Sequence, residues 1–415
     1  MSKKHYNQKS ILVFTQHFWP EEFRINDLCK GLKEFGIKVD VICGIPNYPS
    51  GKIKNVWGFF KKRNEVWNDI NIHRVWEIPR GNNKLFRIFI NFISWPFFCL
   101  FYLPFIRQKY DYILSYQLSP VFMVLPAIIY KYLSKTPLCI YILDYWPFSV
   151  FAVTNIKNIW FKKIIKFTSE WHYKKADKII CVFEGIQKKL INDLGIALNK
   201  TIYIPQACEK LHENKIFDKI LYEKYNNYFC IVFTGSINPT QSFDIIVSAA
   251  KYCIIEGYNN IHWIIVGDGL SKNEIETMVN NLGIKNNFHF EGYHPVDEMP
   301  KYYAIADAFI VAFKKSSLGD FAIPAKIQSY FAAGLPILGA MDGDGRDLIN
   351  NANAGFCGPA NDAKTLYKNI IKLYKLPIDE RIKMGENAKA YHYKFFERDE
   401  QLKKLMNFIF KNENL

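Results

Sequence analysis

The chain lacks the clustered cysteines and histidines that zinc-binding and disulfide-bonded domains require. Its nine cysteines are scattered through 415 residues, mostly inside apolar runs, and no Cys-x-x-Cys pair occurs. This spacing excludes a zinc ribbon or a disulfide scaffold and predicts reduced core cysteines. The first apolar run, Ile11 to Phe14, is too short for the core of a signal peptide. We therefore expect a cytoplasmic protein that holds no metal.

The chain also has no short repeat and no low-complexity tract, and 49% of its residues are hydrophobic. This length and composition predict two domains, each with its own core. The formal net charge of +15 predicts an anionic partner, such as a phosphorylated substrate, an acidic membrane surface or nucleic acid. Because the basic residues are spread along the chain, without a helix-turn-helix or zinc-finger pattern, we expect no nucleic-acid partner.

Apolar runs of strand length alternate with segments of helix length, which predicts an α/β protein with two doubly wound parallel sheets. We expect an N-terminal domain over residues 1–207, a linker over 208–227, a second domain over 228–385 and a C-terminal helix over 386–415. Ligands of such folds bind at the carboxyl ends of the strands. We therefore sought site residues in the loops that follow the predicted strands.

One apolar segment, residues 88–106, is about as long as a membrane span. Two prolines inside it, and a strand-like run directly after it, argue against a true span. We expect a helix that lies partly in the core and partly in the membrane interface. The flanking Lys84, Arg87, Arg107 and Lys109 would meet anionic head groups. A wholly buried core helix remains an alternative.

The segment around Lys326 has the strongest chemical signal. Pro324 suits the first position of a helix, so the free amides of the preceding turn, at Ala322 and Ile323, would point out of the helix start. A lysine in that first turn opposes the helix dipole unless an anion such as a diphosphate binds there. Gln328 follows one turn later on the same face. A solvated Lys326 is the alternative.

The pattern Pro-Ala-Lys-Ile, followed by Tyr330 and by Gly334-x-Pro-Ile, resembles the donor-binding helix of glycosyltransferase family 4. Further resemblances to that family run in order through 266–269, 288–293 and 303–308 in the second domain. In the first domain, 16–21, 46–51 and 144–147 resemble the subgroup that builds bacterial surface polysaccharides, often with amino or deoxy sugars.

The resemblance implies the GT-B fold, in which two facing Rossmann-like domains enclose a deep cleft. It implies a retaining transfer from a nucleotide-sugar donor, UDP-linked by expectation, to a polyprenyl-diphosphate-linked or oligosaccharide acceptor. The enzyme would work peripherally at the inner face of the plasma membrane, with no cofactor and no metal. Asp342-Gly343-Asp344 has metal-site spacing, but it is typical of a turn.

The candidate site residues fall into three sets. The catalytic set is Lys326 for the leaving diphosphate, Asp320 for sugar hydroxyls and Asp144 on the acceptor side. The donor-binding set is Gly235, Ser236, Gln241, Gly267, Tyr293, Ala322, Ile323, Pro324 and Gln328. The acceptor set is His17, Glu21, Arg24 and Trp146, with core packing as the alternative for Trp146. His172 is expected on the surface.

The chain departs from the family pattern at three positions. Asp320 and Gln328 replace two glutamates, and Pro239 stands where an arginine is common. These changes keep open a catalytically degenerate scaffold of a glycan assembly complex. A sugar-nucleotide epimerase, which shares the two-domain architecture, is the other alternative, although its acidic and histidine pattern is missing.

Overall fold

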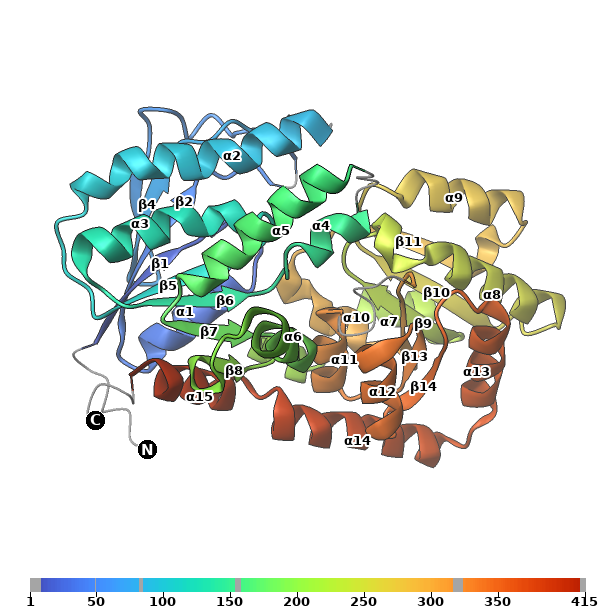
Figure 1. Cartoon of the computed structure of the whole chain (residues 1–415). Coiled ribbons are helices and arrows are strands. Elements are labelled where there is room, and N and C mark those ends of the chain that lie inside the picture. The colour runs from blue at the N-terminus through green and yellow to red at the C-terminus, as the bar shows by residue number, and fades with distance from the viewer. Residues whose placement is uncertain (1–8, 49, 82–84, 154–157, 316–323, 411–415) are drawn as a thin grey trace. The chain divides into compact units, whose positions relative to one another are not determined.

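The computed structural model describes residues 9–48, 50–81, 85–153, 158–315 and 324–410. The chain divides into two compact units, one formed by Met1–Pro205 together with Asp399–Leu415 and the other by Gln206–Arg398. Figure 1 shows each unit as a sheet covered by helices. Both units have the α/β architecture that the sequence predicts.

The first unit contains an eight-stranded sheet in the order β3-β4-β2-β1-β5-β6-β7-β8 within the described residues. Its strands are β1 (Ser10–Phe14), β2 (Lys38–Gly44), β3 (Asn64–Trp67), β4 (Ile70–Val75), β5 (Tyr112–Gln117), β6 (Leu138–Ile142), β7 (Lys178–Cys181) and β8 (Thr201–Tyr203). All neighbours pair in parallel except β3, which pairs antiparallel with β4. The central strands are buried along their length because helices cover both faces.

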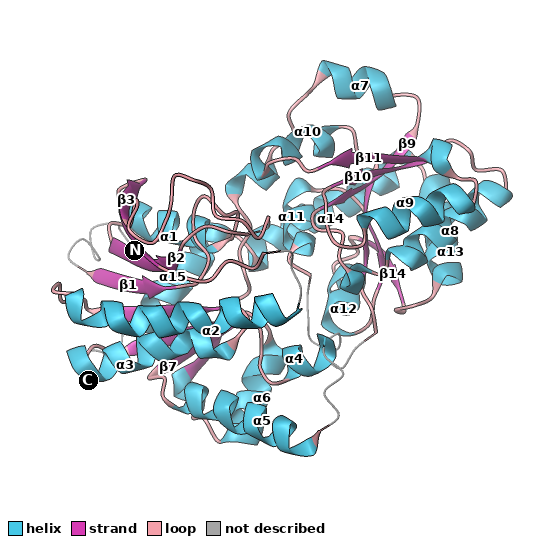
Figure 2. Cartoon of the chain, turned by 90° about the horizontal axis from the view of Figure 1, so that it is seen from above, coloured by secondary structure: helices cyan, strands magenta, loops and turns pink. Residues whose placement is uncertain are grey.

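The helices of the first unit lie on the two faces of this sheet. They are α1 (Ile25–Glu34), α2 (Leu85–Tyr102), α3 (Leu125–Ser134), α4 (Phe148–Val153), α5 (Ile159–Lys174), α6 (Glu184–Leu194) and α15 (Arg398–Phe410), with 3-10 helices η2 (Leu103–Phe105), η3 (Val121–Val124) and η4 (Leu198–Lys200). Helix α1 lies on one face and α2, α3 and α5 lie on the other, and α15 lies with α1 (Figures 1 and 2).

The second unit contains a six-stranded parallel sheet in the order β11-β10-β9-β12-β13-β14 within the described residues. Its strands are β9 (Phe229–Thr234), β10 (Ile261–Val266), β11 (Phe288–Gly292), β12 (Ala308–Ala312), β13 (Ile337–Ala340) and β14 (Gly355–Gly358). Its helices are α7 (Lys219–Tyr225), α8 (Phe243–Ile255), α9 (Lys272–Asn281), α10 (Met299–Ala304), α11 (Lys326–Ala333), α12 (Gly343–Asn351), α13 (Ala363–Lys375) and α14 (Ile378–Phe395), with 3-10 helices η5 (Lys210–Glu213), η6 (Pro239–Gln241), η7 (Lys285–Asn287) and η8 (Val296–Glu298).

Two boundaries differ from the sequence-based expectation. The expected linker 208–227 forms η5 and α7 of the second unit. The expected single helix over 386–415 is divided, because α14 ends at Phe395 and α15 begins at Arg398. The apolar side chains of α15, such as Leu405 and Ile409, are buried in the core of the first unit. The strand β1 and the helix α15 thus belong to the same unit.

Candidate active site

Glycines bring the loops after β9 and β10 into close backbone contact in the second unit. Gly235 N donates a 2.9 Å hydrogen bond to Val266 O, and Ile237 N donates one of 2.9 Å to Asp268 O. Gly267 has a φ of +150°, and a Cβ there would lie 1.9 Å from Gly235 O. Only glycine fits such an approach. Gly235 and Gly267, both expected as donor-binding residues, follow the paired strands β9 and β10.

The ammonium of Lys326 lies beside this glycine loop. Lys326 Nζ donates a 2.7 Å hydrogen bond to Gln241 Oε1 and lies 3.7 Å from the centroid of the Phe233 ring. A Cβ added to Gly235 would be 3.8 Å from the same nitrogen. Within the described residues no carboxylate forms an ion pair with it. Burial lowers the pKa of Lys326 well below its ordinary value of 10.5.

This geometry argues against the alternative of a solvated Lys326, because the lysine is partly buried and its ammonium has a neutral partner. An unpaired buried ammonium is costly unless an anion compensates its charge. The bare glycine backbone next to it leaves room for a ligand to approach. The arrangement can therefore hold an anionic group, and a diphosphate fits it by charge.

The helix behind this lysine begins later than the sequence suggested. Pro324 was expected as its first residue, but α11 begins at Lys326 with Ala325 as N-cap, while Pro324 O accepts a hydrogen bond from Ile327 N in the preceding turn. Its C-terminal end has Gly334 in the left-handed conformation at φ +68°, a common helix stop. Asp320, Ala322 and Ile323 lie outside the described residues.

Gln328 is more deeply enclosed than expected. Its side chain is 2% exposed, and its Oε1 has no hydrogen-bond partner within the described part of the chain. Buried polar atoms are normally paired. The lone acceptor on Gln328 is therefore suited to a hydroxyl donor from outside the described chain.

The remaining donor-side candidates lie around the same strand ends. Ser236 is exposed on the loop after β9. Tyr293 follows the last residue of β11 and is 59% exposed. Gly267 N donates to Gly292 O at 2.7 Å, so the β10 and β11 ends are joined by the backbone. The sequence reasoning passed over the neighbouring His294, which contacts Glu298 Oε2 at 2.6 Å.

In the first unit, His17 and Glu21 form a buried pair at the end of β1. His17 Nδ1 lies 2.6 Å from Glu21 Oε2, and Arg80 Nη2 lies 3.0 Å from His17 Nε2. Because the guanidinium can only donate, His17 Nε2 accepts and Nδ1 carries the proton toward Glu21. Glu21 Oε1 also accepts from the amides of Asn47 and Tyr48 at 2.7 and 2.6 Å. His17 is therefore held by partners on both ring nitrogens.

A second glutamate, Glu77, lies fully buried beside this pair. It accepts from Gln16 Nε2 at 2.6 Å and from Asn47 Nδ2 at 2.5 Å. Burial, aided by the charge of Glu21, raises the pKa of Glu77 well above its ordinary value of 4.5. Neither Glu77 nor Arg80 was among the candidates expected from the sequence, although both follow β4, which ends at Val75.

Asp144 and Trp146 follow β6. Burial raises the pKa of Asp144, while hydrogen bonds from Ser119 oppose the rise. Trp146 Nε1 donates to Ser119 Oγ at 2.9 Å, and its ring packs against Phe122. Trp146 is only 7% exposed, which agrees with the alternative that it packs in the core. Arg24 lies at the N-cap of α1.

His172 is not the surface residue that the neighbouring lysines suggested. It is 3% exposed, and its Nδ1 lies 2.7 Å from Thr168 O on the preceding turn of α5. Burial lowers its pKa. The side chain belongs to the inner face of α5.

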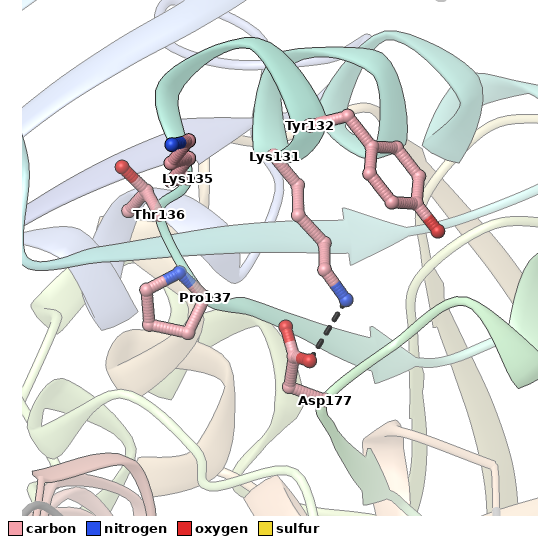
Figure 3. Close-up of a pocket in the computed structure, with 6 residues that line it drawn as sticks. All are labelled: Lys131, Tyr132, Lys135, Thr136, Pro137 and Asp177. Carbon is pink, nitrogen blue, oxygen red and sulfur yellow. Dashed lines mark hydrogen bonds and ion pairs between the residues drawn. The ribbon is translucent and has the colours of Figure 1, made fainter.

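A pocket in the first unit lies away from these candidates (Figure 3). It is lined by Lys131, Tyr132, Lys135, Thr136, Pro137 and Asp177. Pro137 and Asp177 directly precede β6 and β7, so the pocket is at the amino ends of these strands. The Lys131–Asp177 ion pair of 2.8 Å occupies its wall.

The described residues contain no group of three or more metal-ligating side chains, and Asp342 to Asp344 form the N-cap and first turn of α12.

Comparison with known families accounts for both units. The model described as Glycosyltransferase Family 4 matches residues 22–208. The model described as Glycosyl transferases group 1 matches residues 214–391. The chain belongs to glycosyltransferase family 4. The first match begins at residue 22, so it leaves out Glu21 and includes Arg80. The second match includes Lys326.

Two curated relatives of this family 4 chain are distant. It is 24% identical over 261 residues to an uncharacterized glycosyltransferase of Methanocaldococcus jannaschii. That alignment covers 58% of this chain and 63% of the relative. It is 22% identical over 160 residues to the putative colanic acid biosynthesis glycosyltransferase WcaL of Escherichia coli, covering 38% of this chain and 39% of that one. The chain thus aligns with less than two thirds of either relative's length.

A solved structure matches this family 4 chain over nearly its whole length. The crystal structure of HepE from Anabaena in complex with UDP and glucose has a TM-score of 0.70 and 14% identity, and it covers 96% of this chain and 98% of that chain. The shared architecture is the GT-B fold, with two Rossmann-like domains built on parallel sheets, as the sequence resemblance implied.

Proposed function

We propose that this protein transfers a sugar, with retention, from a UDP-linked donor to a polyprenyl-diphosphate-linked or oligosaccharide acceptor. The transfer would serve surface polysaccharide assembly at the cytoplasmic face of the plasma membrane. Support comes from the family, from HepE, whose structure holds UDP and glucose, and from WcaL, whose name places it in colanic acid biosynthesis. The observation that carries the proposal is the partly buried Lys326 ammonium, which lies beside Gly235 without a carboxylate partner in the described chain.

The donor diphosphate would bind at this ammonium. Its negative charge would compensate the cation and restore the ammonium's full protonation. Gly235 and Ser236 present backbone rather than bulky side chains on that side. Gln328 Oε1 would accept a hydrogen bond from a hydroxyl of the ribose, and Tyr293 would lie along the base. Asp320 would orient the sugar hydroxyls, and Pro324 would line the same site.

The chemical step needs stabilisation of the charge that develops on the leaving diphosphate. A fixed cation in a desolvated site does this better than a solvated one, because it needs no reorganisation when the charge appears. Lys326 would supply that cation. The diphosphate oxygen would take the proton of the acceptor hydroxyl, so no separate base and no metal ion is required in this scheme.

The acceptor would contact residues of the first unit. Asp144 and Arg24 are the charged candidates there, and Trp146 would shape the site from its buried position. His17 and Glu21 hold each other and the amides of the loop at Asn47, so their proposed part is to position that loop. Arg80 and Glu77 extend this positioning network.

The test is calorimetric binding of UDP-, GDP- and ADP-sugars to the full-length protein, with Lys326→Met beside the wild type. We expect one UDP-sugar to bind and the variant to lose at least tenfold in affinity. The matched control is Lys364→Met, which removes an exposed lysine of the same unit at the start of α13.

Product analysis completes the test. With the bound donor and a lipid-diphosphate-linked sugar acceptor, NMR of the product should show the same anomeric configuration as the donor, and EDTA should leave the rate unchanged. Failure of every nucleotide sugar to bind would overturn the proposal and favour the degenerate scaffold. An inverted product would overturn retention alone.

A further inference from the structure

The helices α2, α3 and α5 form one layer over the first sheet. Both α2 and α5 contact the 3-10 helix η3, and α2 also contacts α3. Figures 1 and 2 show these helices on the face of the sheet opposite α1 and α15. The inward faces of this layer contribute to the first core, and its outward faces carry side chains of an unusual kind.

The outward face of α2 is a stripe of large apolar side chains. Phe86, Phe89, Ile93, Phe97 and Phe101 recur at helical spacing and are 44% to 72% exposed. The opposite face holds Asn91, Trp95 and Cys99, which are fully buried. The segment Phe86–Phe105 is long and apolar enough to cross a membrane by length and composition. Because one face is packed in the unit's core, we assign the helix to a surface position rather than a span.

The outward face of α5 repeats this feature. Trp160, Ile164, Phe167 and Trp171 follow one stripe of the helix and are 37% to 70% exposed. Ser169, His172 and Tyr173 on the other side are buried. The helix starts cleanly, because the Asn158 side chain accepts from Trp160 N and Phe161 N. The sequence reasoning singled out the first of these two helices and missed the second.

The charge beside the α5 stripe is strongly positive. The helix contains four lysines, at 162, 163, 166 and 174, and one glutamate, Glu170. Lys166 is 67% exposed, whereas Glu170 is 25% exposed. The lysines at 163 and 175 lie over the rings of Trp160 and Trp171, so cations and aromatic rings share one surface. Soluble surfaces rarely gather so many exposed aromatic residues in one layer.

We propose that the outward faces of α2 and α5 together bind the surface of an anionic phospholipid bilayer. The apolar stripes would enter the boundary between head groups and acyl chains, and the lysines would meet lipid phosphates. A second copy of the chain fits less well, because it would bring the same positive helix against itself. The proposal extends the proposed function, since a lipid-linked acceptor is presented at a bilayer.

The experiment uses the full chain and two kinds of vesicle, phosphatidylcholine alone and an equal mixture with phosphatidylglycerol. Cosedimentation should show binding to the mixed vesicles that is at least tenfold stronger than to the neutral ones. The triple variant Trp160→Ser, Ile164→Ser and Phe167→Ser should lower the partition coefficient at least tenfold. The variant Lys162→Gln, Lys163→Gln and Lys166→Gln should abolish the preference for the anionic vesicles.

Matched controls come from the second unit. Ile220, Ile255 and Leu270 are as exposed as the α5 residues, so their triple replacement by serine removes a similar apolar area elsewhere. Lys219→Gln, Lys364→Gln and Lys383→Gln remove three exposed charges. Both controls should bind vesicles like the wild type. Circular dichroism should confirm that all variants fold.

Three results would overturn the proposal. One is a wild type that does not bind the anionic vesicles, and another is an α5 serine variant that binds them as well as the wild type. The third is a wild type that forms a dimer at higher protein concentration, together with a serine variant that loses the dimer and loses vesicle binding to the same extent. Donor binding, measured on the same samples, separates this proposal from the function itself, because Lys326 lies in the other unit.

Discussion

The Nζ of Lys326 lies 2.7 Å from the Oε1 of Gln241, so this partly buried lysine of the second unit is held by a neutral amide. A carboxylate at that position would neutralise the lysine permanently. An amide oxygen orients the ammonium and leaves its charge available. The pair thus keeps an uncompensated cation next to a bare glycine backbone, and this arrangement underlies the first prediction.

Donor binding should take up protons. Burial lowers the pKa of free Lys326, and a bound diphosphate would raise it again. At a pH below the ordinary 10.5 and between the pKa of Lys326 in the free protein and its pKa in the donor complex, the complex holds more protons than the free protein. Calorimetry in two buffers of different ionisation enthalpy should show this uptake. The Lys326→Arg variant, which stays charged, should bind without it, and equal uptake in both proteins would contradict the assignment.

The Gly267→Ala variant should be severely destabilised. Its Cβ would lie 1.9 Å from Gly235 O, so the loop after β9 must move. We expect a loss of more than about 3 kcal/mol in the free energy of unfolding, together with weaker donor binding. Gly283→Ala is the control, because φ there is +68° and nothing lies within 4 Å of the added carbon.

For that control, chemical denaturation should show a loss of only about 1–2 kcal/mol, the cost of a left-handed non-glycine residue. Equal losses at the two positions would mean that the close approach of the two loops is not what requires glycine at position 267.

Replacing Glu77 by glutamine should change how stability depends on pH. The folded pKa of Glu77 is raised by burial, so between 4.5 and that pKa the folded state binds more protons than the unfolded state. Wild-type stability therefore falls with rising pH in this window, because of this residue. The Glu77→Gln variant lacks this decline.

Urea unfolding at pH 5 and pH 8 measures the effect. The free energy of unfolding of Glu77→Gln minus that of the wild type should be larger at pH 8, by at least about 1 kcal/mol. Glu77→Leu is the companion variant, because it leaves Gln16 and Asn47 without their acceptor and should destabilise the fold at both pH values. A difference that does not change with pH would show that Glu77 is ionised throughout.

The cysteines should react only on unfolding. All nine are buried and outside disulfides, and burial raises the pKa of several, such as Cys43 and Cys357, each to about 12. An aromatic disulfide reagent at pH 8 should therefore modify native protein at a rate that follows the unfolding equilibrium as urea is added. Rapid modification of one thiol without denaturant would identify a locally open segment.

Much of the fold was readable because local patterns and global structure agree. The strand runs at β1, β2, β5 and β9, and the helices between them, repeat the periods that a doubly wound sheet requires. The antiparallel β3 was missed, because its alternating exposed residues bury too little to stand out. The C-terminal helix was misjudged at its break, since helical periodicity continues on both sides of Phe396.

The sequence by itself determined the family and the two-sheet architecture, and it singled out Lys326 as a candidate, since these depend on spacing along the chain. Only the tertiary structure decided what each side chain meets. It set Lys326 against Gln241 and Phe233, brought Glu77 to Gln16 and Arg80 to His17 from 61 and 63 positions away, and packed α2 and α5 against the same 3-10 helix, η3. Such contacts are fixed by strand order and crossovers, which no local pattern encodes.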